Sequence, residues 1–173
     1  MSKKELKTYL LGLSKPQLET QIIDLYDRFK EVKELYDFTF NPNENKLMDE
    51  CKFKISKEYF PLNSRRPKAR RSVAQNYIRH FMKLGVEPTL IAEVMIYNLE
   101  LALAFSMEGK TMKEAFFKSM LKSFQDALNY IYDNGLFLKF MSRIEKILDH
   151  SLEQQWINYK GFEIAFEKYN DTK

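Results

Sequence analysis

The basic side chains of this 173-residue chain gather in one segment. The formal net charge is only +4, yet residues 61–85 contain seven Lys and Arg residues and no Asp or Glu. These seven are Arg65, Arg66, Lys68, Arg70, Arg71, Arg79 and Lys83. Guanidinium and ammonium groups bind phosphate and carboxylate through charge-assisted hydrogen bonds, so we expect a surface that binds anions or an acidic partner. The rest of the chain is balanced or slightly acidic, which excludes a uniformly basic coat.

We expect residues 64–83 to form a helix that carries these cations. At 100° per residue, its basic and apolar side chains lie on opposite faces. The basic face would hold Lys68, Ser72, Gln75, Arg79 and Lys83, and the apolar face Val73, Tyr77, Phe81 and Leu84. The densest charges lie at the expected helix N-terminus, where the helix dipole disfavours cations. Three kinds of anion could neutralise them: carboxylates of neighbouring helices, a phosphate group at the helix amides, or a polyanion.

A pair of carboxylates offers a different chemistry. Glu93, Tyr97 and Glu100 lie at positions i, i+4 and i+7 of the most apolar segment. Two carboxylates on one buried face would have raised pKa values and could act as a general acid and a base. They could equally lie on an exposed edge or pair with arginines of the preceding helix. An enzyme that uses Glu93 and Glu100 is therefore a third functional hypothesis.

Other catalytic and metal chemistries lack the residues they need. Neither His80 nor His150 lies three residues after a glutamate, as a helical di-iron site requires. Cys51 is the only cysteine, which argues against a structural zinc site, and nothing in the sequence places it beside a histidine. No two glycines lie closer than 24 residues, so glycine-rich nucleotide-binding loops are excluded. We therefore expect no metal, no cofactor and no catalytic residue of these kinds.

Helix punctuation occurs throughout the chain. Four capping boxes predict helix starts near residues 3, 15, 42 and 112. They pair Ser2 with Glu5, Ser14 with Gln17, Asn41 with Glu44 and Thr111 with Glu114. The glycines at 85, 109, 135 and 161 each follow an apolar periodic run, and Pro16, Pro42 and Pro88 suit first helical turns. We predict a single all-α domain over residues 1–173, a bundle of seven or eight helices in mostly antiparallel hairpins.

Apolar stripes show how these helices should pack. Leu18, Ile22, Leu25, Phe29, Val32 and Tyr36 recur at alternating intervals of four and three, which predicts one stripe along the second helix. Residues 88–107 are apolar on most of their circumference and should form the central helix. The aromatic residues that recur between Trp156 and Tyr169 should dock the last helix on the bundle.

Composition indicates a compartment and argues against a membrane span. The chain is 45% hydrophobic and 30% charged, enough apolar material for a core. A single cysteine and an N-terminus without a continuous apolar run lead us to expect a cytoplasmic protein. The apolar window from Leu90 to Met107 contains Glu93, Asn98 and Glu100, which would be costly at membrane depth, so we expect no membrane span.

Four strings occur in order along most of the chain. They are LSKPQLETQIIDLYDRF (13–29), FNPNENKL (40–47), RRPKARRSVAQNYIRHF (65–81) and LGVEPTLIAEVMIYNLELA (84–102). In these strings the chain resembles a bacterial family of small proteins classed only as a domain of unknown function. The resemblance implies an all-helical cytosolic protein and assigns no activity or catalytic residue.

Two functional hypotheses use the basic segment. The first is a non-enzymatic interaction or regulatory module whose basic helix, 64–83, binds an acidic partner or a phosphate. The second is nucleic-acid binding through the same helix; residues 3–22 are similar to units of the SAP nucleic-acid-binding modules, although the connection Gly12–Ser14 leaves no room for their extended loop. Salt dependence separates the two, since neutralising about five phosphates gives a slope of log K against log salt near −4.5 for duplex DNA. The sequence leaves the oligomeric state open.

Overall fold

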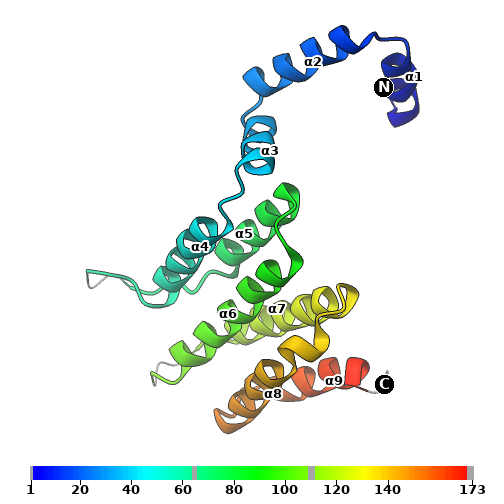
Figure 1. The fold of residues 1–173 in the computed structure, drawn as a ribbon. Helices are drawn as coiled ribbons and strands as arrows, with labels where there is room; N and C mark the ends of the chain where they lie inside the picture. Colours follow the sequence, from blue (N-terminus) through cyan, green and yellow to red (C-terminus); the bar gives the residue numbers. More distant parts are fainter. Residues whose placement is uncertain (1, 64–65, 109–111, 171–173) are drawn as a thin grey trace. The chain divides into compact units, whose positions relative to one another are not determined.

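A computed structural model describes residues 2–63, 66–108 and 112–170, and these residues form nine helices and no strand (Figure 1). The all-α prediction is confirmed, with one helix more than the seven or eight expected. The helices are α1 (Lys3–Leu11), α2 (Lys15–Arg28), α3 (Lys30–Phe40), α4 (Glu44–Tyr59), α5 (Arg71–Leu84), α6 (Pro88–Ser106), α7 (Glu114–Asp133), α8 (Phe137–Glu153) and α9 (Tyr159–Asn170).

The chain separates into two compact units, residues 1–43 and residues 44–173. The first contains α1 to α3 and the second contains α4 to α9. The prediction of one domain over residues 1–173 stays a prediction. The basic segment lies in the second unit.

Capping boxes begin the first two helices, as predicted. The Ser2 backbone N–H donates to Glu5 Oε2 over 2.6 Å, and the Ser14 N–H donates to Gln17 Oε1 over 2.8 Å. Pro16 lies in the first turn of α2, where a missing N–H costs nothing. The prediction that one helix carries the whole apolar stripe is wrong. The chain leaves helical geometry at Phe29, so the stripe is divided between α2 and α3.

Helix α6 is the centre of the second unit and contacts α4, α5, α7 and α8 (Figure 1). The prediction of a central helix is confirmed, and residues such as Ile91, Val94 and Leu99 are almost completely buried. By length and composition alone α6 could cross a bilayer, and 56% of its most apolar window is buried inside the protein. Inside the core, Asn98 accepts a hydrogen bond of 3.0 Å from the Tyr59 hydroxyl.

The C-terminal aromatic residues dock α9 on the other helices of the second unit, as predicted. Phe162 is fully buried and Trp156 is 4% exposed. The Trp156 ring packs edge-on against Phe116, Phe117 and Phe162, with ring centroids 5.5 to 5.8 Å apart. The Trp156 indole N–H also donates to Gln154 Oε1 over 3.1 Å. Aromatic pairs of this geometry stabilise a core beyond the area they bury.

Several predicted helix ends are shifted. Asn41 caps the end of α3, and α4 begins at Glu44, so Pro42 precedes the helix. Thr111 lies outside the described residues, as does Gly109, and α7 begins at Glu114. Gly85 and Gly135 follow helix ends with left-handed φ of 73° and 67°.

The glycine at 161 does not end a helix. It lies inside α9, where an added Cβ would come within 2.6 Å of Leu121 Cδ2. A close contact between two helices, and not a turn, therefore explains this glycine. Sequence alone does not separate these two uses of glycine, because both follow an apolar run.

Candidate anion-binding site

Among the described residues of the basic segment, only those of its second half are helical. The prediction of a helix over 64–83 is corrected: α5 begins only at Arg71. The described residues 66–70 before it form an irregular segment without regular secondary structure. Arg65 lies outside the described residues. The buried face of α5 consists of Ala74, Ile78, Phe81 and Leu84. Val73 and Tyr77, which were expected on that face, are only half-buried.

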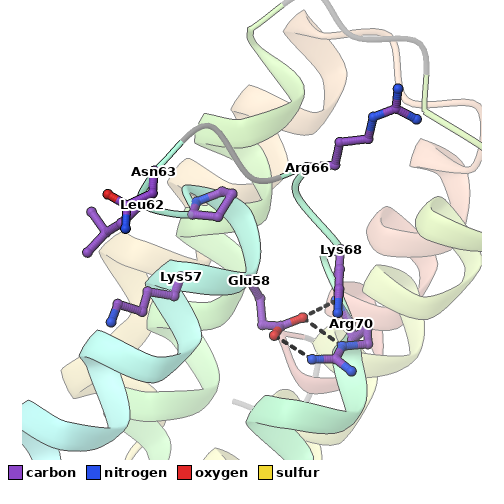
Figure 2. A pocket seen from close by; sticks show the side chains of 8 residues that line it. Lys57, Glu58, Leu62, Asn63, Arg66, Lys68 and Arg70 are labelled. Carbon is purple, nitrogen blue, oxygen red and sulfur yellow. Dashed lines mark hydrogen bonds and ion pairs between the residues drawn. The ribbon is translucent and has the colours of Figure 1, made fainter.

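Glu58, at the end of α4, holds residues 68–70 in place. Its backbone carbonyl accepts the N–H groups of Lys68 and Ala69 over 3.0 and 2.9 Å. Its carboxylate accepts bonds from Arg70 Nε over 2.9 Å and from the second guanidinium nitrogen over 2.7 Å (Figure 2). The Arg70 backbone N–H approaches the same carboxylate at 3.4 Å. These bonds offset the strain at Ala69, whose φ is +46° in a region that disfavours side chains.

The charge on Glu58 is stabilised by its cationic neighbours. The hydrogen bonds from Arg70 hold the pKa of the Glu58 carboxyl below its ordinary value of 4.5, against a smaller opposing effect of burial. The positive charge of Lys68 lowers this pKa further. Glu58 is therefore ionised at neutral pH, and Arg70 is committed to an internal ion pair.

Arg71 is also paired inside the protein. Its Nε donates to the Ser123 hydroxyl over 2.9 Å, and its terminal nitrogen lies 2.5 Å from Asp126 Oδ2, both on α7. Lys122 contacts the other oxygen of Asp126 at 2.9 Å. The helix dipole disfavours a cation at the first position of α5, and Asp126 supplies the compensating negative charge.

Of the described cations of the segment, Arg66, Lys68, Arg79 and Lys83 form no ion pair with a described carboxylate. Arg79 donates to Asn76 Oδ1 over 2.6 Å and to the Gln75 carbonyl over 3.3 Å. Lys83 is exposed near the end of α5. Arg66 and Lys68 are exposed as well, and they lie on the irregular segment before the helix.

Arg66 and Lys68 line a hollow of about 340 Å³ between the end of α4 and the irregular segment (Figure 2). We call it the basic hollow, and its lining residues are Lys57, Glu58, Pro61, Leu62, Asn63, Arg66, Lys68 and Arg70. Four cations against one carboxylate give this lining a formal charge of +3. In Figure 2, Lys68 lies beside the Glu58–Arg70 pair, and Arg66 extends away from it.

One cation of the basic hollow is already engaged. The Lys57 ammonium lies 3.8 Å from the centre of the Phe53 ring. Such a cation–π contact stabilises the ammonium position without neutralising its charge. Arg66 and Lys68 are therefore the two cations with the greatest capacity for an added anion.

A second hollow, of about 550 Å³, shares three residues with the first: Arg66, Lys68 and Arg70. The rest of its lining is largely apolar and includes Phe105 of α6 and Phe116 of α7. The basic residues thus form the common border between a charged hollow and an apolar one.

The carboxylates predicted as an acid–base pair are held in an ion-pair cluster. Arg143 of α8 donates to both oxygens of Glu100 over 2.7 Å and also to Glu93. Lys52 of α4 contacts Glu93 over 3.0 Å and lies 5.3 Å from the centre of the Tyr97 ring. The two carboxylates share a face, but their cations come from α4 and α8 and not from the preceding helix.

The electrostatics of this cluster suit an ion pair more than an acid catalyst. Burial alone would raise the pKa of Glu93, but hydrogen bonds from Arg143 and Lys52 outweigh it and leave the pKa below its ordinary value. The hydrogen bonds of Arg143 to Glu100, and to a lesser extent to Glu93, raise the pKa of Arg143 against the opposing effect of burial. A general acid at neutral pH needs a raised carboxyl pKa, so Glu93 has the opposite shift.

No metal-binding group of three His, Cys, Asp or Glu side chains occurs in the part of the chain that the structure describes. Cys51 is fully buried, and burial raises the pKa of its thiol to about 12. A buried protonated thiol is a poor nucleophile.

Four residues important for these clusters were not identified from the sequence: Glu58, Asp126, Ser123 and Arg143. Their partners are distant in sequence, from 12 residues for Glu58 and Arg70 to 55 for Arg71 and Asp126. The available signal was only indirect, since uncompensated cations at a helix start require acidic neighbours from elsewhere.

A family model described as a family of unknown function (DUF6155) matches residues 1–170. Comparison with curated proteins and with solved structures gave no significant match.

Proposed function

Since the chain belongs to the family of unknown function DUF6155, we propose its function from the site itself: a non-enzymatic interaction module that binds a phosphate-bearing or acidic partner at the basic hollow. One observation carries the proposal. Glu58 and Asp126 neutralise Arg70 and Arg71, and Arg66 and Lys68 remain at the border of a concave site without a carboxylate partner among the described residues.

The geometry favours a small number of anionic groups. Arg66 offers a planar guanidinium and Lys68 an ammonium, and both suit phosphate or carboxylate oxygens. The side chain of Asn63 adds a neutral donor to the same lining. Glu58 fixes the backbone around Lys68, so less ordering accompanies binding.

Nucleic-acid binding through the same segment is less well supported. Arg70 and Arg71 are engaged in internal pairs, which removes two of the five cations between residues 65 and 71. If Lys57, Arg66 and Lys68 alone met duplex DNA, log K would fall against log salt with a slope near −2.7, against about −4.5 for five contacts. An enzyme based on Glu93 and Glu100 has no favourable observation, because Arg143 engages both carboxylates.

Calorimetric titration with inorganic pyrophosphate at low salt tests the proposal. The pocket variant is Arg66→Gln with Lys68→Gln, and the matched control is Arg79→Gln with Lys83→Gln, which removes the same charge from α5. We expect the pocket variant to bind pyrophosphate about tenfold or more weakly than the wild type, because each charge-assisted bond contributes about 1.5–3 kcal/mol.

The control variant should retain most of the wild-type affinity, since Arg79 and Lys83 do not line the basic hollow. An equal loss of pyrophosphate affinity in both variants would show that binding depends on the overall positive charge and not on the basic hollow, and would contradict the proposal. Absence of pyrophosphate binding by the wild type at low salt would contradict the proposal directly. Tight binding of duplex DNA with a slope near −4.5 would favour the nucleic-acid hypothesis instead.

A further inference from the structure

The three N-terminal helices bury no side chain. Every side chain described between residues 2 and 43 is exposed or half-buried. Large apolar side chains are among the exposed ones: Ile22 and Leu25 are each 44% exposed, and Phe29 is 49% exposed. Short helices are marginal in water unless an apolar face is buried, so this face needs a cover.

The spacing of the apolar side chains in α2 and α3 matches a coiled-coil seam. The seam residues follow one another at intervals of four, three, four, three and four: Leu18, Ile22, Leu25, Phe29, Val32 and Tyr36. This is the a/d pattern with which one helix packs against another. The seam crosses Phe29, the one residue at which the helix is interrupted.

Phe29 is an unusual place for a helix to end. It is extended, with φ −119° and ψ 114°, and its side chain makes no capping hydrogen bond. The helices on either side come within one residue of each other, and neither Gly nor Pro lies between Gln17 and Asn41. Helices normally stop at such residues or at polar caps. A change in the backbone of Phe29 alone would join α2 and α3 into one helix.

The charges of this region indicate what covers the seam. Residues 1–43 contain seven basic and seven acidic side chains, so they attract neither a polyanion nor a polycation. Ion pairs four residues apart neutralise several of them: Lys15 with Glu19, Arg28 with Asp24, and Lys30 with Glu34. The apolar seam is thus the feature of this region that lacks a complementary surface. A second copy of the chain presents an identical apolar seam that can cover it.

We propose that residues 15–40 form one continuous helix that pairs antiparallel with the same helix of a second copy of this chain. In this antiparallel pair the two-fold axis passes near Asp27, so each residue at an 'a' position of the heptad packs against a residue at a 'd' position of the second copy. Leu18 then faces Tyr36 of the second copy, Ile22 faces Val32, and Leu25 faces Phe29.

Flanking charges favour the antiparallel direction, because its two attractions between Glu19 and Lys33 outnumber the single contact between the two Arg28 residues near its centre. In the antiparallel pair Glu19 lies near Lys33 of the second copy, and symmetry repeats this attraction at the other end. A parallel pair would place Arg28 against Lys33 of the second copy, which is repulsive.

Sedimentation equilibrium on the full chain tests the pairing. The wild type should be dimeric, and Ile22→Asp should raise the dimer dissociation constant about 100-fold or more, because symmetry removes two buried isoleucines. Ile23→Asp is the matched control, since Ile23 is 61% exposed and lies outside the seam. A wild type that remains monomeric over a wide range of concentration would overturn the proposal, as would equal effects of the two substitutions.

Disulfide crosslinking tests the direction in a Cys51→Ala background. The double variant Ile22→Cys with Val32→Cys should form a covalent dimer on oxidation, because each cysteine then faces its counterpart. The single variants should not. Efficient crosslinking of Ile22→Cys alone would show a parallel pair and contradict the antiparallel register.

The continuous helix has a separate readout. The Tyr26 hydroxyl donates to Asp37 Oδ1 over 2.7 Å in the bent form. In a straight helix these residues would lie about 16 Å apart along the axis. Tyr26→Phe removes this bond and should tighten the dimer about two- to tenfold. A weaker dimer would show that the bent form is the one that pairs.

Discussion

At the C-terminal end of α4, the single residue Glu58 organises the basic segment. Its carbonyl and its carboxylate together accept bonds from the backbone of residues 68–70 and from the Arg70 side chain. Glu58 has two opposing effects on the proposed function. Its backbone carbonyl holds the N–H of Lys68 in place, and its carboxylate places a negative charge inside the basic hollow.

Glu58→Gln should separate these two effects. Loss of the charged bonds to Arg70 should lower the free energy of unfolding by about 1–2 kcal/mol at pH 7. Removal of the negative charge should tighten pyrophosphate binding about fivefold, since a unit charge at about 4 Å contributes about 1 kcal/mol in water. Chemical denaturation and calorimetric titration measure the two quantities. Weaker binding together with lower stability would contradict this role.

The stability effect of Glu58→Gln should depend on pH with a definite sign. Because the folded protein lowers the pKa of Glu58, its stabilisation is fully present above the ordinary value of 4.5 and is lost as pH falls through the lower folded value. The difference in unfolding free energy between wild type and variant should therefore shrink below about pH 4.5. A difference that grows on acidification would contradict the ion pair with Arg70.

At the scale of the helices, local signals predicted starts better than packing faces. The capping boxes at Ser2 and Ser14 are present, because a capping box involves only neighbouring residues. In α8 the sequence spacing predicts an apolar stripe of Phe137, Met141, Ile144, Leu148 and Leu152, but the buried face is rotated from it: Phe140, Ile144 and Ile147 are buried, while Leu152 is 52% exposed. The positions of the neighbouring helices determine which face of α8 is buried. The spacing of apolar residues within α8 does not contain this information.

The candidate site shows the same limit. Sequence identified three of the four cations that line the basic hollow, Arg66, Lys68 and Arg70, since their clustering is local, but it did not identify Lys57. It did not identify Glu58 or predict the irregular segment, because Ala69 adopts its left-handed φ only with bonds from a distant helix end. Among the described cations of the predicted surface, Arg70 and Arg71 are paired internally, and Arg66 and Lys68 remain beside the basic hollow without an ion pair.

The cluster on α6 is the second prediction at the scale of helices. Arg143 joins α8 to α6 through Glu93 and Glu100. Arg143→Met should lower the free energy of unfolding by about 1–3 kcal/mol, because it leaves two half-buried carboxylates with less compensation. Lys146→Met on the exposed side of α8 is the control, with an expected change within about 0.5 kcal/mol. Equal changes in the two variants would contradict the role of the ion pairs.

At the scale of the whole molecule, the small net charge of +4 conceals a local arrangement. Carboxylates from outside the basic segment neutralise Arg70 and Arg71, while Arg66 and Lys68 remain at a concave site. The apolar seam of residues 15–40 is separate from this site in sequence and in chemistry. We therefore propose that residues 44–173 bind the anion and that residues 1–43 mediate self-association.

Amide chemical shifts of the isotope-labelled full chain, recorded during titration with pyrophosphate, give a direct test of anion binding at the basic hollow. Binding there should produce the largest saturable shifts at Asn63, Lys68 and Ala69, with small shifts at Arg79 and Lys83 on α5. Saturable shifts centred on Arg79 and Lys83, or no saturable shift anywhere, would contradict anion binding at the basic hollow.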